Sequence, residues 1–161
     1  MNYYEALLLK ARKKGLVVLE MDLGTNKKCG KLLDNNIILN KNMTQSDKYE
    51  ILAEEIGHYD TSHGHICDQS KIENRKQELT ARRYGYKYIA TPHSFVEAIK
   101  NGARDLESLA EHFLISIELL VDIITDWKKQ YGLGVHIGEY YLQLHPSINL
   151  HENYPQNFIN G

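Results

Sequence analysis

The sequence lacks the features that mark secreted and membrane proteins. It has only two cysteines, Cys29 and Cys67, and neither belongs to a C-x-x-C pair. This usage is typical of reduced thiols in the cytosol and argues against a disulfide framework. No apolar run approaches the roughly 18 residues of a transmembrane helix. The apolar stretch at residues 6–9 is too short for a signal peptide, so we expect a soluble cytoplasmic protein without a membrane partner.

The sequence also has no excess of charge of one sign. Its 19 Lys and Arg residues oppose 21 Asp and Glu residues, and the formal net charge is −2. Such a balance gives no overall field that attracts nucleic acid or anionic lipid. Hydrophobic residues make up 42% of the chain, which suffices for a globular core. Any metal site must therefore serve function rather than folding.

Hydrophobic periodicity, capping residues and turn signals predict an α+β chain. We expect helices over residues 3–14, 44–59, 70–89, 95–100, 106–113 and 117–131, and strands over 16–21, 30–33, 37–40 and 140–144. The early strands are expected to form a small antiparallel sheet. The prediction divides the chain into a core over residues 1–92, a helical subdomain over 93–132 packed on that core, and a C-terminal strand and tail over 133–161.

One predicted helix carries an arrangement typical of metal chemistry. Side chains four positions apart lie on one face of a helix, so Glu54 and His58 can hold a single ion. Glu55, one step around the helix, can then reach a water molecule beside that ion. The spacing is that of the H-E-x-x-H metallopeptidase motif with glutamate in place of the first histidine. Carboxylate oxygen is an accepted zinc ligand, so this replacement is compatible with a metal site.

The next predicted helix supplies a further candidate ligand. Glu78 is followed at i+3 and i+7 by Ala81 and Gly85, so a carboxylate is flanked by small residues on one face. Such a face can pack closely against the first motif helix and bring Glu78 to the ion. A catalytic zinc ion takes three protein ligands and keeps one position open, so a third ligand is expected.

The segment between these two helices offers alternative donors. The alternative or supporting groups there are Asp60, His63, His65 and Asp68. Side chains of this kind commonly orient metal ligands through hydrogen bonds. If Glu54 is not a ligand, His63 or Asp68 is the preferred replacement.

Taken together, these motifs resemble a known family. The chain reads L-A-E-E-I-G-H-Y over residues 52–59, D-Q-S-K over 68–71 and E-x-x-A-x-x-Y-G over 78–85. It is similar here to the ImmA/IrrE family of metallopeptidases, and in particular to the small phage and mobile-element members. The resemblance spans roughly residues 3–131 and includes the order of strands, motif helix and E-x-x-A helix.

The resemblance implies a zincin-like α+β core with metal ligands on the two motif helices. Carried over by position, it implies Glu55 as the general base and His58 and Glu78 as ligands of a zinc ion. Glu54 stands where most of the family has histidine, and we predict it as the remaining ligand. Tyr84 is a candidate to help stabilise the oxyanion. The implied activity is cleavage of a helix-turn-helix repressor, usually encoded nearby, which releases genes of a phage or another mobile element.

Three alternatives remain open at the level of sequence. A ligand set rich in carboxylates also admits manganese or iron. A chain with glutamate at position 54 is alternatively a catalytically silent zincin-like protein that acts as an anti-repressor by binding alone. Residues 105–124 also read as a helix-turn-helix. However, residues 116–126 contain three carboxylates and no Lys or Arg, which argues against direct contact with nucleic acid.

Overall fold

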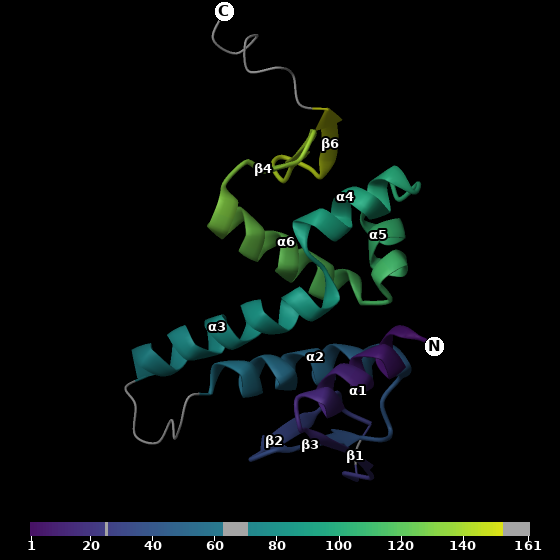
Figure 1. Ribbon diagram of the computed structural model, residues 1–161, viewed down its shortest axis with the longest axis vertical. Coiled ribbons are helices and arrows are strands. Elements are labelled where there is room, and N and C mark those ends of the chain that lie inside the picture. The colour runs from purple at the N-terminus through teal and green to yellow at the C-terminus, as the bar shows by residue number, and fades with distance from the viewer. Residues whose placement is uncertain (25, 63–70, 153–161) are drawn as a thin grey trace, which may run out of the picture. The chain divides into compact units, whose positions relative to one another are not determined.

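The chain folds into two compact units, Met1–Ile89 and Ala90–Gly161. The computed structural model describes residues 1–24, 26–62 and 71–152. Helices and short strands occur in both units, which confirms the predicted α+β class (Figure 1). Within the described ranges, no helix combines the length and the apolar character that a membrane crossing requires.

The first unit follows the predicted order of elements. Its elements are α1 (Tyr3–Lys13), β1 (Val17–Met21), β2 (Gly30–Leu33), β3 (Asn36–Asn40), α2 (Gln45–Thr61) and α3 (Lys71–Ile89). Side-chain caps begin the helices: Asn2 caps α1, and the Thr44 hydroxyl accepts a hydrogen bond from the Asp47 amide at 3.1 Å. Within this unit, α2 lies between the sheet on one side and α3 on the other (Figure 1).

The sheet of the first unit is mixed, so the prediction of an antiparallel sheet is wrong. The strand order is β1-β3-β2, in which β1 and β3 are parallel and β2 and β3 are antiparallel. β3 takes the central position, and its side chains Ile37 and Leu39 are fully buried there. The segment between β1 and β2 carries the chain past this central position. The β2–β3 hairpin then returns β3 alongside β1 in the same direction.

Two glycines bring α2 and α3 into backbone contact. A Cβ atom on Gly57 would collide with the carbonyl oxygen of Ala81 and would lie 2.7 Å from the amide nitrogen of Gly85. A Cβ atom on Gly85 would lie 2.8 Å from the carbonyl oxygen of Ala53. Backbone atoms cannot turn aside as a flexible side chain can. The predicted close packing of the small α3 face against α2 is therefore confirmed.

A polar cluster joins α1, β1 and α2. Glu20 accepts hydrogen bonds from the Tyr4 hydroxyl at 2.8 Å and from the Lys48 ammonium at 2.6 Å. Burial alone would raise the pKa of Glu20, but the hydrogen bonds from Lys48 and Tyr4 outweigh burial and hold that pKa below its ordinary value. The ionised carboxylate is therefore part of the folded structure.

The described part of the second unit, residues 90–152, contains three helices and a separate sheet. Its elements are α4 (Pro92–Lys100), α5 (Leu106–Phe113), α6 (Ile117–Tyr131), β4 (Gly134–Ile137), β5 (Tyr140–Gln143) and β6 (Asn149–Glu152). Phe95 packs edge-on to Trp127, with ring centroids 4.6 Å apart, and stacks on Phe113 at 5.2 Å. These rings form the centre of the helical part. The helix-turn-helix interpretation of α5 and α6 stays a prediction.

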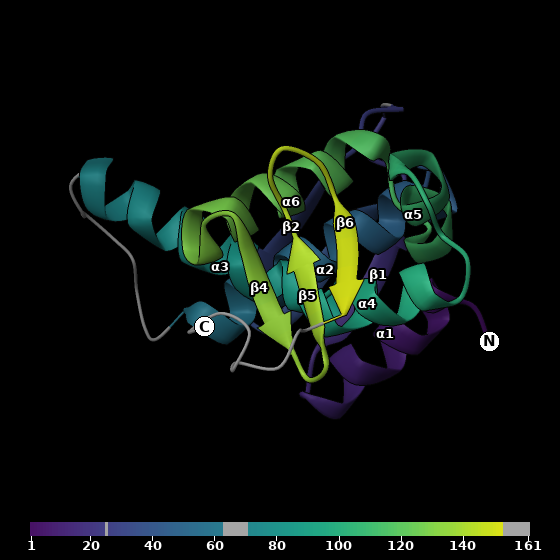
Figure 2. The ribbon, with the colours of Figure 1, turned by 90° about the horizontal axis from the view of Figure 1, so that it is seen from above.

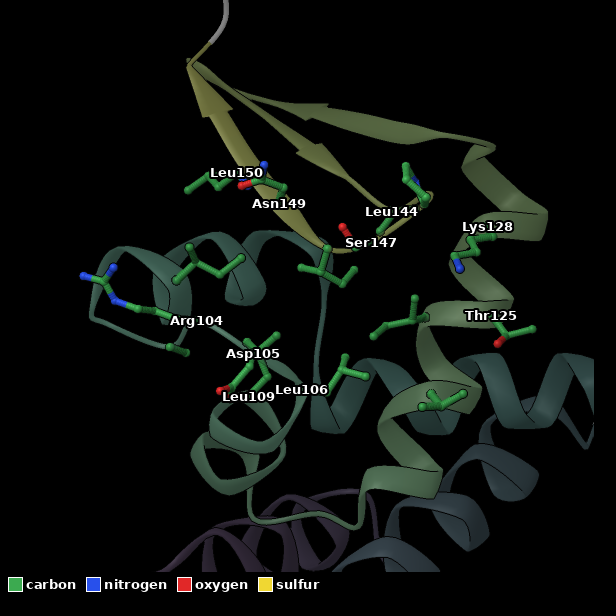
Figure 3. Close-up of a pocket in the computed structure, with 16 residues that line it drawn as sticks. Arg104, Asp105, Leu106, Leu109, Thr125, Lys128, Leu144, Ser147, Asn149 and Leu150 are labelled. Atoms are coloured by element: carbon green, nitrogen blue, oxygen red, sulfur yellow. The ribbon is translucent and has the colours of Figure 1, made fainter.

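The sequence predicts one strand in this unit, whereas the structure has an antiparallel sheet in the order β4-β5-β6 (Figure 2). The two additional strands have four residues each and include the polar residues His136 and His151. A strand of four residues gives too little alternation for a sequence pattern to detect. An open pocket of about 830 Å³ is also found in this unit, next to the segment that leads into β6 (Figure 3).

We expect Gly57→Ala to destabilise the first unit by roughly 1–3 kcal/mol, as overpacking does. In a helix with free space, alanine is instead more stable than glycine by about 1 kcal/mol, so the sign of the change tests the contact. Urea unfolding followed by far-UV circular dichroism measures this change in the free energy of unfolding. Lys76→Ala on the exposed side of α3 is the control and should change stability by less than about 0.5 kcal/mol. A stabilised Gly57→Ala chain would contradict the backbone contact.

We also expect the cost of Glu20→Gln to depend on pH. Because the pKa of Glu20 is lower in the folded chain, its stabilising contribution is complete above the unfolded pKa and is lost as the pH falls through the folded pKa. Urea unfolding should therefore show a larger loss of stability at neutral pH than in acid. Val18→Ala, a neighbouring apolar change on β1, should lower the free energy of unfolding by the same amount at both pH values. An equal loss of stability on Glu20→Gln at neutral and at acid pH would argue against the ionised cluster.

Candidate metal centre

A pocket of about 580 Å³ in the first unit lies between the two motif helices and one strand of the sheet. The residues that matter for its chemistry are Lys31 and Leu32 of β2, Glu55 and His58 of α2, and Gln77 and Glu78 of α3. Three of the residues singled out from the sequence therefore meet in one place.

The imidazole of His58 faces the carboxylate of Glu78 across the two helices. Nε2 of His58 lies 3.5 Å from Oε2 of Glu78. Zinc binds nitrogen and oxygen ligands at about 2.0–2.2 Å, so two donors at this separation can share one ion. The side chains are 27% and 54% exposed, so an ion could reach them from solvent. The structure thus brings together two of the predicted ligands.

Glu55 lies in the same pocket and has an unusual environment for a carboxylate. Burial raises its pKa, the neighbouring His58 lowers it, and the charges of Glu54 and Glu78 raise it again. The backbone N–H of Leu32 donates a hydrogen bond to the carboxylate, which acts against these increases. The net pKa of Glu55 is above its ordinary value. A carboxylate with a raised pKa is a better proton acceptor, as general-base catalysis requires.

Glu54, the predicted third ligand, lies at the contact between α2 and α3. Its Cα is 3.2 Å from the position that a Cβ atom on Gly85 would take. Glu54 is not among the residues that line the pocket, although its charge acts on Glu55. Its role as a ligand stays a prediction.

Tyr84 is not among the residues that line the described pocket. Tyr84 is 42% exposed on α3, with the Lys87 ammonium 4.8 Å from its ring centroid. The alternative donors His63, His65 and Asp68 lie outside the described residues. Whether any of them approaches the ion also stays a prediction.

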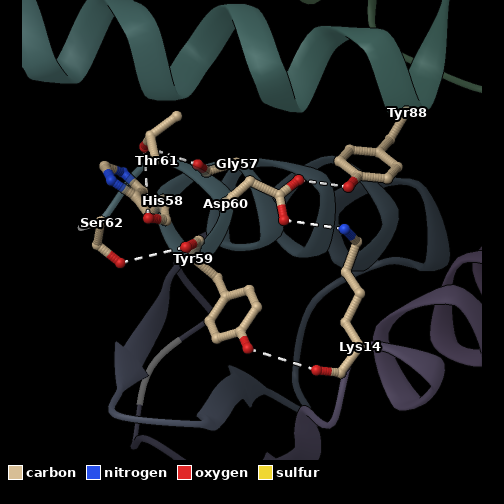
Figure 4. Close-up of polar contacts among 8 residues, drawn as sticks. All are labelled: Lys14, Gly57, His58, Tyr59, Asp60, Thr61, Ser62 and Tyr88. Carbon is tan, nitrogen blue, oxygen red and sulfur yellow. Dashed lines mark hydrogen bonds and ion pairs between the residues drawn. The ribbon is translucent and has the colours of Figure 1, made fainter. Parts of the chain in front are cut away.

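Asp60 belongs to the last turn of α2, which continues to Thr61, and not to a loop. Its carboxylate accepts hydrogen bonds from the Lys14 ammonium at 2.9 Å and from the Tyr88 hydroxyl (Figure 4). Figure 4 shows the His58 ring and the Asp60 carboxylate on different sides of α2. Asp60 therefore ties α1 and α3 to α2 and does not line the pocket.

Gln77 is a pocket residue that no sequence pattern singled out. Its Oε1 atom is buried and accepts no hydrogen bond from the described part of the chain. Leaving a buried acceptor unsatisfied costs about 1–3 kcal/mol, so a bound water, cation or substrate donor would stabilise this site. Gln77 lies on a polar helix, where a glutamine gives no sequence signal that its amide oxygen will be buried.

The described residues fit part of a metal site. His58 and Glu78 supply the nitrogen and oxygen donors that zinc accepts, and the unsatisfied oxygen of Gln77 lies in the same pocket. Within residues 1–24, 26–62 and 71–152, no three His, Cys, Asp or Glu side chains are placed to hold one ion. A third such ligand would require movement of a described residue or a residue outside these ranges.

Comparison with known proteins gives one match. The pattern that defines the IrrE N-terminal-like domain, peptidase family M78, matches residues 11–124, which include both motif helices and the whole pocket. Searches of curated proteins and of solved structures found no match. The matched family implies a metallopeptidase-like function and a divalent metal ion, typically zinc. Because the match covers more than half of the sequence, the chain belongs to the IrrE N-terminal-like, or ImmA/IrrE, family.

Proposed function

We propose that this chain is a zinc-dependent endopeptidase that cleaves a helix-turn-helix transcriptional repressor and so relieves repression of phage or mobile-element genes. The observation that supports this proposal most directly is the meeting of Glu55, His58 and Glu78 in one pocket. Membership of a metallopeptidase family supports the reaction class. The repressor substrate and its genetic setting belong to the proposal.

His58 and Glu78 would hold the ion, with Glu54 as the third ligand. His63 or Asp68 is the alternative to Glu54. When bound, the ion would supply Lewis-acid chemistry, polarising the scissile carbonyl and making a water molecule more acidic. The short contact between His58 and Glu78 already brings two donors from different helices to one point. Such preorganisation reduces the cost of closing a site around the metal.

The open edge of β2 offers a place for the substrate. In the described part of the chain, β2 pairs with β3 on one side only, and Lys31 and Leu32 line the pocket. An extended peptide that adds to this edge would run past Glu55. Backbone pairing of this kind fixes the direction of the peptide and brings one of its carbonyl groups to the reactive centre.

Glu55 would perform the proton transfers. It accepts a proton from the attacking water as the oxygen–carbon bond forms, and it then gives that proton to the leaving nitrogen as the carbon–nitrogen bond breaks. The carboxylate is thereby restored and no other co-reactant is consumed. Its raised pKa, caused mainly by burial, favours the first transfer.

The metal site predicts a specific zinc content. Elemental mass spectrometry should find about one zinc per chain, and His58→Ala and Glu78→Ala should each lose it because a catalytic zinc ion needs its protein ligands. His112→Ala, at an exposed position on α5, is the control and should retain the metal. Absence of zinc from the native chain, even after reconstitution, would rule out the zinc peptidase.

The third ligand is identified by the same measurement. Zinc should be lost from Glu54→Ala and retained in His63→Ala and Asp68→Ala if the predicted ligand set is correct. The reverse pattern would move the ligand to the segment between the two helices. Retention of zinc in all three variants would show that none of them supplies a required ligand.

Catalysis by Glu55 predicts that Glu55→Gln lowers repressor cleavage by at least about 100-fold while zinc stays bound, since an amide cannot accept the proton. The assay uses the zinc-loaded chain and the helix-turn-helix repressor encoded beside its gene. Glu139→Gln, the same chemical change at an exposed turn, should leave the rate unchanged. Full activity of Glu55→Gln would exclude this residue as the base.

A second candidate function is anti-repression by binding alone. It is favoured by the lack of a complete three-ligand group among the described residues. In that case the zinc-loaded native chain would bind the repressor without cutting it, and Glu55→Gln would release the repressor from its operator as well as the native chain does.

A further inference from the structure

The second unit holds an open groove that the proposed peptidase chemistry does not use (Figure 3). Its apolar lining includes Leu106 and Leu109 of α5, Val121 and Ile124 of α6, and Leu144 and Leu150. In Figure 3, Asn149 and Leu150 lie on one side and Asp105, Leu106 and Leu109 on the opposite side. The groove therefore runs between β6 and the helices, and a pocket of this size accommodates several side chains.

The strand beside the groove has an unpaired edge. Within residues 71–152, β6 pairs with β5 on one side and with no strand on the other. The N–H of Leu150 donates a hydrogen bond to the Oδ1 atom of its neighbour Asn149 at 2.9 Å, as an amide that faces away from β5 can. In an antiparallel pair, alternate residues direct their backbone groups to opposite sides. The backbone groups of Leu150, and by alternation those of Glu152, therefore face the open edge, where an incoming strand would replace the local bond from Leu150 to Asn149.

Two cations at the groove have no carboxylate partner among the described residues. No ion pair joins Arg104 or Lys128 to an acidic residue in the described part of the chain. The nearby Asp105 caps α5 by accepting a hydrogen bond from the Ser108 amide at 2.7 Å. Figure 3 shows Arg104 and Lys128 on opposite sides of the pocket. The groove is therefore apolar inside and has cations free to pair with an acidic ligand.

We infer that this groove binds an extended acidic segment of a partner protein as an additional strand on β6. The segment pairs with the backbone of Leu150 and Glu152, and every second side chain enters the groove as an apolar group. Its carboxylates pair with Arg104 and Lys128. An amphipathic helix would match the apolar lining but would leave the N–H and C=O groups of the strand edge unpaired. The binding needs neither metal nor Glu55.

Peptide selection on the full-length Glu55→Gln chain provides the probes, because this variant cannot use Glu55 to cut a bound peptide. A display library of random peptides long enough to span β6 should yield sequences in which apolar residues alternate with others and Asp or Glu recurs. Enrichment of basic sequences, or of sequences without alternation, would overturn the inference. Failure to enrich any sequence would do so as well.

Matched substitutions on α6 place the binding site. Lys128→Glu should weaken the selected peptides about tenfold in calorimetry, because reversing the charge replaces an attraction by a repulsion. Lys129→Glu, an adjacent exposed lysine outside the groove, should change affinity little. Val121→Lys should also weaken binding, whereas Ile117→Lys should not, although both side chains are 42% exposed. Equal effects within each pair would overturn the assignment.

Amide hydrogen exchange tests the strand geometry. Exchange at Leu150 and Glu152 should slow when peptide binds, and a helical bound peptide without such protection would contradict strand addition. If the free chain self-associates and Lys128→Glu abolishes this, the groove belongs to a second copy and the inference is wrong. Far-UV circular dichroism confirms that each variant is folded. A zinc-loaded native chain that binds the selected peptides but does not cleave the repressor would refute the proposed function and leave this inference intact.

Discussion

The backbone contact between α2 and α3 sets the geometry on which the candidate site depends. Helices usually pack with axes about 8–10 Å apart because side chains separate them, and Gly57 and Gly85 remove that separation locally. His58 directly follows Gly57, and Glu78 lies two turns before Gly85 on the facing helix. A larger residue at either glycine would move the helices apart and lengthen the 3.5 Å contact between His58 and Glu78. Each glycine weakens its helix by about 1 kcal/mol relative to alanine, and the close approach that the site requires explains why glycine stands there.

The central position of α2 explains why polar side chains are buried around it. Lys48 and Glu50 both lie inside the first unit, 7% and 4% exposed, because α2 is covered by the sheet as well as by its neighbouring helices. Each has a partner of opposite charge outside the helix, Glu20 on β1 for Lys48 and Lys28 before β2 for Glu50. The outer partners Glu20 and Lys28 are 35% and 39% exposed, so each pair is half-buried, and its loss would leave a buried charge on α2 without a partner. We interpret these pairs as fixing the register of the sheet against α2, and hence the position of Leu32 beside Glu55.

What could be predicted from the sequence was local. The helices follow from apolar spacing and from capping residues such as Thr44 and Asp105, which act within a few positions. The pairing of β1 with β3 depends on the path of the whole first unit, and the short polar strands β4 and β6 depend on their partner β5, so no local pattern revealed them. The spacing of Glu55 and His58 was readable because one helix carries both residues. The pocket positions of Gln77 and Leu32 could not be read from the sequence, since each arises only when distant segments meet.

In the part of the chain that the structure describes, each unit presents an open strand edge beside a pocket, but the two pockets differ in chemistry. The one beside β2 contains a buried carboxylate and a facing imidazole–carboxylate pair, which suits bond cleavage. The groove beside β6 has apolar side chains and two cations that form no ion pair within the described ranges, which suits retention of a peptide without reaction. A partner held at β6 would experience an increased effective concentration of its cleavable segment at β2, provided that the linking chain can span both edges. If both proposals hold, recognition and cleavage would be able to change independently, because the groove residues and the residues of the candidate metal centre belong to different units.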